Sequence, residues 1–162
     1  TPIRSNSARV LGTFALYYRK PQRADAWHMR LTDLCQQLCT LALEREQIRQ
    51  RVHQLAFYDT LTGLPNRIMF SARAEQALTQ AEYAGEPAAL MFINIDRFKL
   101  INDSQGHAAG DGLLRDIALR VNDQITATAM LARLSGDEFA LALPQCSAEQ
   151  ASAAAEIGRA HV

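Results

Sequence analysis

The longest regular pattern in the chain is a run of apolar residues spaced three and four apart between residues 25 and 57. This spacing places one apolar stripe along an α-helix, and it fills seven of eight core positions of successive heptads, with Arg45 at the eighth. We therefore expect a coiled coil that forms a parallel homodimer through residues 31–55, while an amphipathic helix packed on its own domain is the alternative. The seven apolar residues are Leu31, Leu34, Leu38, Leu41, Ile48, Val52 and Leu55.

A strand pattern precedes this helix. Residues 9–18 are rich in β-branched and aromatic side chains, and Pro21 in the following polar stretch indicates a turn. No second strand is predicted before residue 9, so the predicted strand has nothing to pair with. We therefore expect residues 1–24 to be the last part of a domain that begins outside this chain.

Beyond residue 57, helical and strand patterns alternate, and Gly and Pro residues separate them. The order is helix, strand, helix, strand, strand, which predicts an α/β (α+β) layer with antiparallel pairing in its sheet. We expect an N-cap at Asn66, a helix at 67–83, a strand at 88–95, a helical turn at 96–103, a turn between Gly106 and Gly110, a helix at 111–122, a β-hairpin of strands 130–134 and 138–143, and an Ala-rich helix at 148–155.

Charge is distributed unevenly along the 162 residues, although the net charge is zero. Residues 1–57 carry nine basic and four acidic side chains, whereas residues 58–162 carry eight and thirteen, which suggests two units with different roles. The acidic second unit argues against nucleic-acid binding. No apolar run approaches the roughly 18 residues of a membrane helix and no signal peptide is recognisable, so we expect a cytoplasmic protein without a membrane segment.

The three cysteines, Cys35, Cys39 and Cys146, do not form the pattern of a disulfide framework. Free thiols in a reducing cytoplasm are the simplest interpretation. Cys35 and Cys39 lie four residues apart on one helical face, but without a third ligand in register they do not indicate a metal site.

Acidic side chains gather in two turns of the second unit, residues 94–103 and residues 135–139. If strand 88–95 lies beside the hairpin, both turns meet at one edge of the sheet. Oxygen ligands there suit a hard divalent cation, while backbone amides and Lys99 suit phosphates, so a metal-bound triphosphate is one interpretation. Solvated acidic turns without a ligand are the other.

Three motifs, DTLTGLPNR at 59–67, FINIDRFKLINDSQGHAAGD at 92–111 and ARLSGDEF at 132–139, resemble the GGDEF family of diguanylate cyclase domains. The resemblance covers residues 58 to about 155. It implies a ferredoxin-like nucleotidyl-cyclase palm, truncated at its C-terminus in this chain. It also implies a dimer that joins two GTP molecules into cyclic di-GMP with Mg²⁺ (or Mn²⁺).

The resemblance also implies roles for individual residues. Asn102 and Asp111 match residues that read the guanine edge, and Phe98 and Lys99 match the turn that wraps the phosphates. Asp59 and Arg67 match a turn with a structural role. The catalytic and metal positions of the family fall on Asp137, Glu138, the backbone carbonyl of Ile95, and Asn94.

This chain departs from the family at several of these positions. Asn94 stands where the family has a metal-binding Asp, which removes one negative charge, and Asp96 compensates in part if the strand pleat keeps both on one face. Ser135 replaces the first Gly of the signature, which is costly if a left-handed turn or a close backbone approach to phosphate is needed there. Residues 126–129 lack the Arg-x-x-Asp of the family's inhibitory product site.

Residues at both ends of the chain carry further expectations. TPIRSNSARVLGTFALYYRKPQ and the long helix after it resemble the end of a GAF domain and a signalling helix. The arrangement resembles oxygen-sensor-type proteins in which an EAL phosphodiesterase follows the GGDEF domain. We interpret residues 157–162, IGRAHV, as a non-native tail, because one frame of a sequencing-library adapter encodes them. With an incomplete sheet, low stability or aggregation is expected.

Three functions follow from these observations. The first is a degenerate GTP-binding GGDEF domain that regulates a linked EAL phosphodiesterase outside this chain. The second is an active diguanylate cyclase, and the third is a dimerising connector that binds no nucleotide. Cyclic di-GMP synthesis separates the first two, and GTP binding separates both from the third.

Overall fold

The computed structural model describes residues 2–4, 10–15, 17, 19 and 23–160. The chain divides into two compact units, residues 1–53 and 54–162. No helix among the described residues combines the length and the apolar character needed to cross a bilayer.

The first unit contains a small antiparallel sheet and most of a long helix. Strand β1 (Pro2–Arg4) pairs with β2 (Val10–Thr13), and the side chain of Ile3 is buried. The expectation of an unpaired strand is therefore wrong, because a three-residue strand is too short to show an alternating pattern in the sequence. The observed strand is also shorter than predicted: it ends at Thr13, and residues 9, 16, 18 and Pro21 lie outside the described part.

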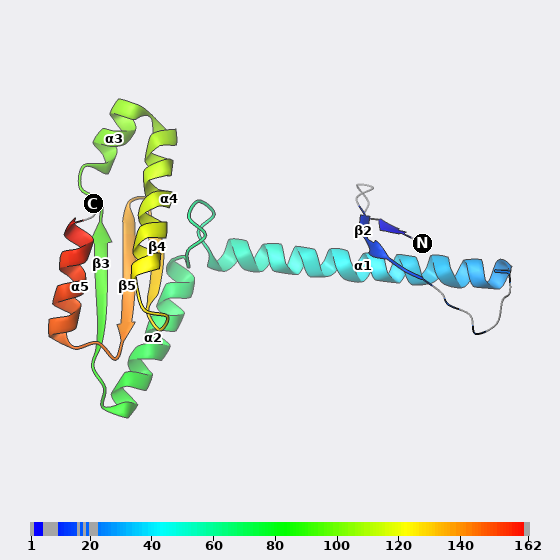
Figure 1. Cartoon of the computed structure of the whole chain (residues 1–162), viewed down its shortest axis with the longest axis horizontal. Coiled ribbons are helices and arrows are strands. Elements are labelled where there is room, and N and C mark those ends of the chain that lie inside the picture. Colours follow the sequence, from blue (N-terminus) through cyan, green and yellow to red (C-terminus); the bar gives the residue numbers. More distant parts are fainter. Residues whose placement is uncertain (1, 5–9, 16, 18, 20–22, 161–162) are drawn as a thin grey trace. The chain divides into compact units, whose positions relative to one another are not determined.

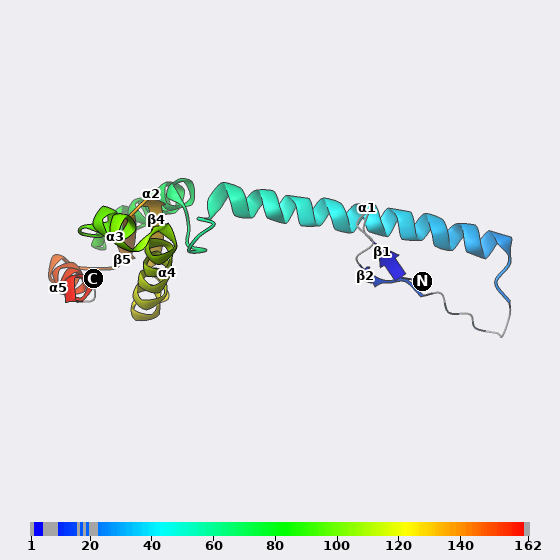
Figure 2. The same cartoon turned by 90° about the horizontal axis from the view of Figure 1, so that it is seen from above.

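Helix α1 (Ala26–Phe57) is continuous, as Figures 1 and 2 show from two sides. Asp25 accepts hydrogen bonds from the backbone N–H groups of Trp27 and His28, so it caps the first turn. No residue of α1 is buried. Six of the seven apolar heptad residues are more than half exposed, namely Leu34, Leu38, Leu41, Ile48, Val52 and Leu55.

The second unit is built on a three-stranded antiparallel sheet with the order β3–β5–β4. Its strands are β3 (Ala88–Asn94), β4 (Met130–Ser135) and β5 (Glu138–Pro144). The register places Ala88 opposite Pro144 and Asn94 opposite Glu138, so the end of β3 meets the tip of the β4–β5 hairpin. The predicted α/β layer with antiparallel pairing is confirmed.

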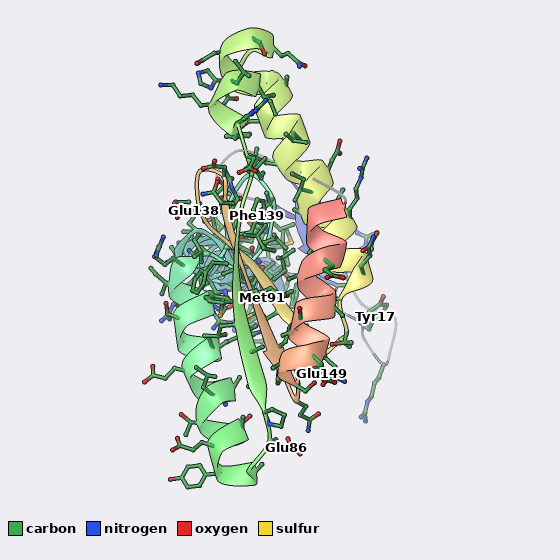
Figure 3. The ribbon with its side chains drawn as sticks, turned by 90° about the vertical axis from the view of Figure 1, so that its left-hand side faces the viewer. Tyr17, Glu86, Met91, Glu138, Phe139 and Glu149 are labelled. Atoms are coloured by element: carbon green, nitrogen blue, oxygen red, sulfur yellow. The ribbon has the colours of Figure 1, made fainter. Side chains whose placement is uncertain are left out.

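Helices cover the sheet on two sides (Figure 3). Helix α2 (Arg67–Ala84) packs Phe70 and Ala74 on one face, where the strands present Ala132, Ala140 and Ala142. These small side chains let the helix approach the sheet closely. Helix α4 (His107–Gln124) packs on the other face against Phe139 and Leu141, since successive strand residues point to opposite sides.

Three further features complete this unit. Helix α3 (Phe98–Gln105) follows β3, and helix α5 (Ala148–Ala160) follows β5 and packs beside β3 (Figure 1). Asn66 caps α2 as predicted, because its side chain accepts from the N–H groups of Ile68 and Met69 at 3.0 and 3.1 Å. His161 and Val162 of the expected non-native tail lie outside the described residues.

Two predicted elements require correction. The helical turn expected at 96–103 is the helix α3, which begins two residues later because Arg97 has a left-handed backbone, with φ of 58°. The helix expected at 111–122 begins at His107, so Gly110 lies inside α4 rather than in a turn. The prediction of a turn rested on Gly106 and Gly110, of which Gly106 precedes α4 and Gly110 lies inside it.

Candidate nucleotide and metal site

The hairpin tip and the end of β3 bring the acidic turns together, as the sequence predicts. The N–H of Ile95 donates to the backbone carbonyl of Asp137 at 3.3 Å, which joins the two segments directly. Glu138 and Phe139 lie at this end of the sheet in Figure 3. Asn94, Ile95, Asp137 and Glu138 therefore share one sheet edge, and the adjoining turn carries Asp96.

Glu138 has Asn94 and Ser135 as its direct cross-strand neighbours, one on each side. Side chains opposite each other in antiparallel strands lie about 5 Å apart at Cβ. The hydroxyl of Ser135 donates to Oε2 of Glu138 at 2.8 Å. Arg67, at the start of α2, reaches the same oxygen at 3.4 Å, a long contact between two exposed side chains.

Ser135 does not have the strained backbone expected for a residue in a Gly position. The left-handed residue of the tip is Gly136, with φ of 45°, whereas Ser135 ends strand β4 in extended conformation. The left-handed turn, one of the two conditions under which a side chain at position 135 would be costly, is therefore not required at Ser135. The condition for compensation by Asp96 is not met either, because β3 ends at Asn94 and the pleat does not extend to residue 96.

Arg133 holds the hairpin tip in place through hydrogen bonds, a role that the sequence analysis did not predict. Its guanidinium donates to both carboxylate oxygens of Asp59, at 3.1 and 3.0 Å, and to the carbonyl of Gly136 at 2.9 and 2.7 Å. Its position two residues before the SGDEF signature, which begins at Ser135, was the one feature of the sequence that could have indicated this role. Partial burial raises the pKa of Asp59, but hydrogen bonds from Thr62 and Arg133 outweigh it and hold that pKa below its ordinary value. The pair therefore stays charged at neutral pH.

The turn after α1 is held at both ends. Asp59 accepts from the N–H and hydroxyl of Thr62 at 2.8 and 2.7 Å, and its own N–H donates to Leu64. The side-chain amide of Asn66 donates to the carbonyl of Ala56 at 2.8 Å, so the end of α1 is tied to the start of α2. The structural role inferred for the DTLTGLPNR motif accords with these bonds.

Helices α3 and α4 form the corner that carries the expected guanine-reading residues. Gly110 is buried, and a Cβ on it would collide with the side-chain amide of Asn102 and lie 3.1 Å from the ring of Phe98. The absence of a side chain at Gly110 thus lets Asn102 lie against α4, next to the position of Asp111. Lys99 is exposed on the first turn of α3.

A groove of about 480 Å³ lies on the α2 face of the sheet, and most of its lining residues come from α2 and β3. Its floor is apolar, with Phe70, Leu90 and Phe92 among its lining residues, and Arg67 lies at its wall. None of the acidic residues of the hairpin tip lines it, and neither does Asn102 or Asp111. The groove therefore contains none of these expected site residues, although Arg67 at its wall also contacts Glu138.

The donor set at the sheet edge fits a hard divalent cation. The carboxylates of Asp137 and Glu138, the amide oxygen of Asn94 and the carbonyl of Ile95 are all oxygen ligands, the type that Mg²⁺ and Mn²⁺ prefer. Within the described residues no cluster of three or more His, Cys, Asp or Glu could hold a metal. The donor set therefore resembles a Mg²⁺ site in which the protein supplies one or two carboxylates and water and substrate phosphates supply the other ligands.

Comparison with known proteins assigns the chain to a family. Residues 56–162 match the family described as diguanylate cyclase, GGDEF domain, and the chain therefore belongs to that family. The resemblance of residues 58 to about 155 to GGDEF domains is thus confirmed.

Individual relatives agree with this assignment. Diguanylate cyclase TpbB of Pseudomonas aeruginosa is 41% identical over 119 residues, which are 74% of this chain and 24% of TpbB. The bifunctional diguanylate cyclase/cyclic di-GMP phosphodiesterase MucR of the same species is 39% identical over 116 residues, or 72% of this chain and 17% of MucR. The chain spans about a quarter or less of the length of these relatives.

Among solved structures, the coiled coil and GGDEF domain of DgcB from Caulobacter crescentus, in complex with c-di-GMP, is similar with a TM-score of 0.68. It is 30% identical, and the match covers 83% of this chain and 68% of that one. The fold of the second unit is therefore a GGDEF-type fold, preceded by a long helix.

Proposed function

We propose that this chain is a GTP-binding GGDEF module of cyclic di-GMP signalling whose own cyclase activity is weak or absent. The observation that carries the proposal is the pair of Asn94 and Glu138, opposite each other at the site edge. A neutral amide stands where the family has a carboxylate, so the site offers a divalent cation one negative charge fewer. Asp137, Glu138, Asn102 and Asp111 match the family at their positions.

Each of these residues has a role in nucleotide binding. Asn102 and Asp111 present an amide and a carboxylate, which can pair with the donors and acceptors of a guanine edge. Phe98 and Lys99 lie in the first turn of α3, where Lys99 supplies a backbone N–H and a positive charge for phosphates, while the N–H of Phe98 donates to the carbonyl of Ile95 at 3.3 Å. The Asp59–Arg133 pair holds the hairpin tip, and with it Asp137 and Glu138, in one position.

A bound Mg²⁺ or Mn²⁺ would neutralise phosphate charge and favour attack of a 3′-hydroxyl on the α-phosphate. Asp137, Ile95 and Asn94 would hold it, with Glu138 beside them. Asn94 would offer the cation a neutral oxygen, and this would hold it less strongly than a carboxylate would.

The long helix supports a homodimer. An apolar heptad stripe that is more than half exposed at six positions needs a partner, and a second copy of α1 in parallel register would cover it. The solved DgcB structure also combines a coiled coil with a GGDEF domain. We therefore favour dimerisation over packing of α1 on its own domain.

The same proposal extends to the longer protein. We infer that residues 1–24 belong to a GAF-like sensor domain, 25–57 to a signalling helix and 58–156 to the GGDEF domain, and that 157–162 are a non-native tail. The regulated enzyme would be a linked EAL phosphodiesterase. The name of the relative MucR likewise combines a diguanylate cyclase with a cyclic di-GMP phosphodiesterase. With GTP as ligand and three free thiols, a cytoplasmic location fits.

The test is GTP binding by the purified protein in the presence of Mg²⁺, measured by calorimetry, with Asn102→Ala for comparison. We expect Asn102→Ala to lose about tenfold or more in affinity, because a polar group of the bound guanine left without its partner costs about 1–3 kcal/mol. Thr79→Ala, at an exposed position of α2 outside the expected site, is the matched control and should bind as the unmodified protein does. If Asn102→Ala leaves the GTP affinity unchanged, GTP does not bind at the expected site, and this result would support a connector without a nucleotide site.

An active cyclase is the second candidate, and a specific observation favours it. The hairpin tip carries both acids in the family order, and Ser135 fits there without left-handed backbone. Asn94 is then the remaining departure in the metal site, and its effect on cyclic di-GMP synthesis separates the two candidates.

A further inference from the structure

Ser135 and Asn94, the two departures from the family pattern at the sheet edge, are neighbours of the same side chain. Ser135 on β4 and Asn94 on β3 both lie opposite Glu138 on β5. One departure removes a carboxylate beside Glu138, and the other adds a hydroxyl beside it. The register of the sheet thus couples two substitutions that are 41 positions apart in the sequence.

The hydroxyl of Ser135 is used by Glu138 alone among the described residues. It donates to Oε2 at 2.8 Å, the ordinary length of a hydrogen bond to a carboxylate. Arg67 reaches the same oxygen at 3.4 Å from an exposed position, which contributes little. Within residues 23–160, Oε1 of Glu138 takes no hydrogen bond, so one oxygen is held and the other is available.

A glycine at position 135 would leave Glu138 with the long Arg67 contact only. The side chain of Glu138 is about half exposed, and an unrestrained carboxylate of this kind rotates among several positions. Hydrogen bonds from neighbouring groups orient metal-binding carboxylates and raise metal affinity. A hydroxyl one strand away can therefore restore part of the affinity that the neutral amide of Asn94 removes.

We propose that Ser135 is a positioning residue, whose hydroxyl holds Oε2 of Glu138 and keeps Oε1 in place for a divalent cation at the sheet edge. The proposal rests on the proposed GTP and metal site, and it assigns Ser135 a favourable role there. Ser135 acts through Glu138 and contacts no substrate itself.

The test is the affinity for Mn²⁺ without nucleotide, measured on the full chain from the electron paramagnetic resonance signal of free Mn²⁺. We expect Ser135→Ala to weaken Mn²⁺ binding roughly tenfold, the lower end of the effect of removing such a partner. Ser135→Thr keeps the hydroxyl and should bind within about twofold of the unmodified protein. Thr79→Ala, on α2, is the control for loss of a hydroxyl elsewhere, and thermal unfolding confirms that each variant is folded.

A second step shows whether Ser135 acts through Glu138. In a Glu138→Gln background, Ser135→Ala should change Mn²⁺ affinity no further, since the positioned carboxylate is already lost. An unchanged or tighter Mn²⁺ affinity of Ser135→Ala in the unmodified background would overturn the proposal, as would a full Ser135→Ala effect without Glu138. If the unmodified protein binds no Mn²⁺ at all, both this inference and the metal site of the proposed function fall. If it binds Mn²⁺ and Ser135→Ala has no effect, only this inference falls.

Discussion

At the scale of single residues, small side chains and short bridges decide the geometry of the site. Arg133 joins Asp59 to the carbonyl of Gly136, so one guanidinium connects the turn after α1 with the hairpin tip. Gly110 has the same importance in the α3–α4 corner. It is buried against Asn102 and Phe98, where any side chain would displace a residue of the expected guanine pocket.

Gly110→Ala tests this packing directly. We expect a loss of about 1–3 kcal/mol in the free energy of unfolding, because the new methyl group overlaps the amide of Asn102. GTP affinity should fall as well. Gly112→Ala, in the same helix, meets nothing within 4 Å and should gain up to about 1 kcal/mol from helix propensity. Urea denaturation of both variants checks this, and equal effects of the two substitutions would contradict the packing argument.

The residues of the site were largely predictable, whereas their partners were not. Asn94, Ile95, Asp137 and Glu138 follow from motif order, and the sheet register brings them to one edge as expected. The Ser135–Glu138 and Arg133–Asp59 bonds depend on strand register and on a turn far away in the sequence. Sequence spacing does not show such contacts, because they form between separate elements.

At the scale of elements, periodicity predicted long segments well and short ones poorly. Helix α1 was predicted within one residue at its start, since a sustained heptad pattern is a strong signal. Strand β1 has three residues and gives no such signal. Helix α4 was shortened in the prediction, because glycines that serve packing resemble those that serve turns.

Arg45 tests the coiled-coil interpretation of α1. It occupies a core position in a stripe that is otherwise apolar, where a charged side chain lowers the stability of a dimer. We expect Arg45→Leu to strengthen self-association at least tenfold by sedimentation analysis, since about 1.4 kcal/mol corresponds to that factor. Gln50→Leu, outside the heptad core, is the control. Equal association of the two variants would contradict a seam through residues 31–55.

At the scale of the whole molecule, the chain joins a basic unit to an acidic one through a continuous helix. Within the second unit, Asn66 ties the last turn of α1 to α2, and Arg133 ties the following turn to the hairpin tip. This series of contacts connects the helix end with Asp137 and Glu138. A displacement of the last turn of α1 would therefore act on the hairpin tip through these hydrogen bonds.

The most direct test of the central claim is the amount of cyclic di-GMP that the purified protein forms from GTP and Mg²⁺, with Asn94→Asp measured alongside. The proposed function predicts little or no product from the unmodified protein, although GTP binds. It also predicts an increase of about tenfold or more in Asn94→Asp, which regains a carboxylate worth about 1.4 kcal/mol or more to a bound cation. Efficient synthesis by the unmodified protein, without a further increase in Asn94→Asp, would contradict the claim and identify a working cyclase.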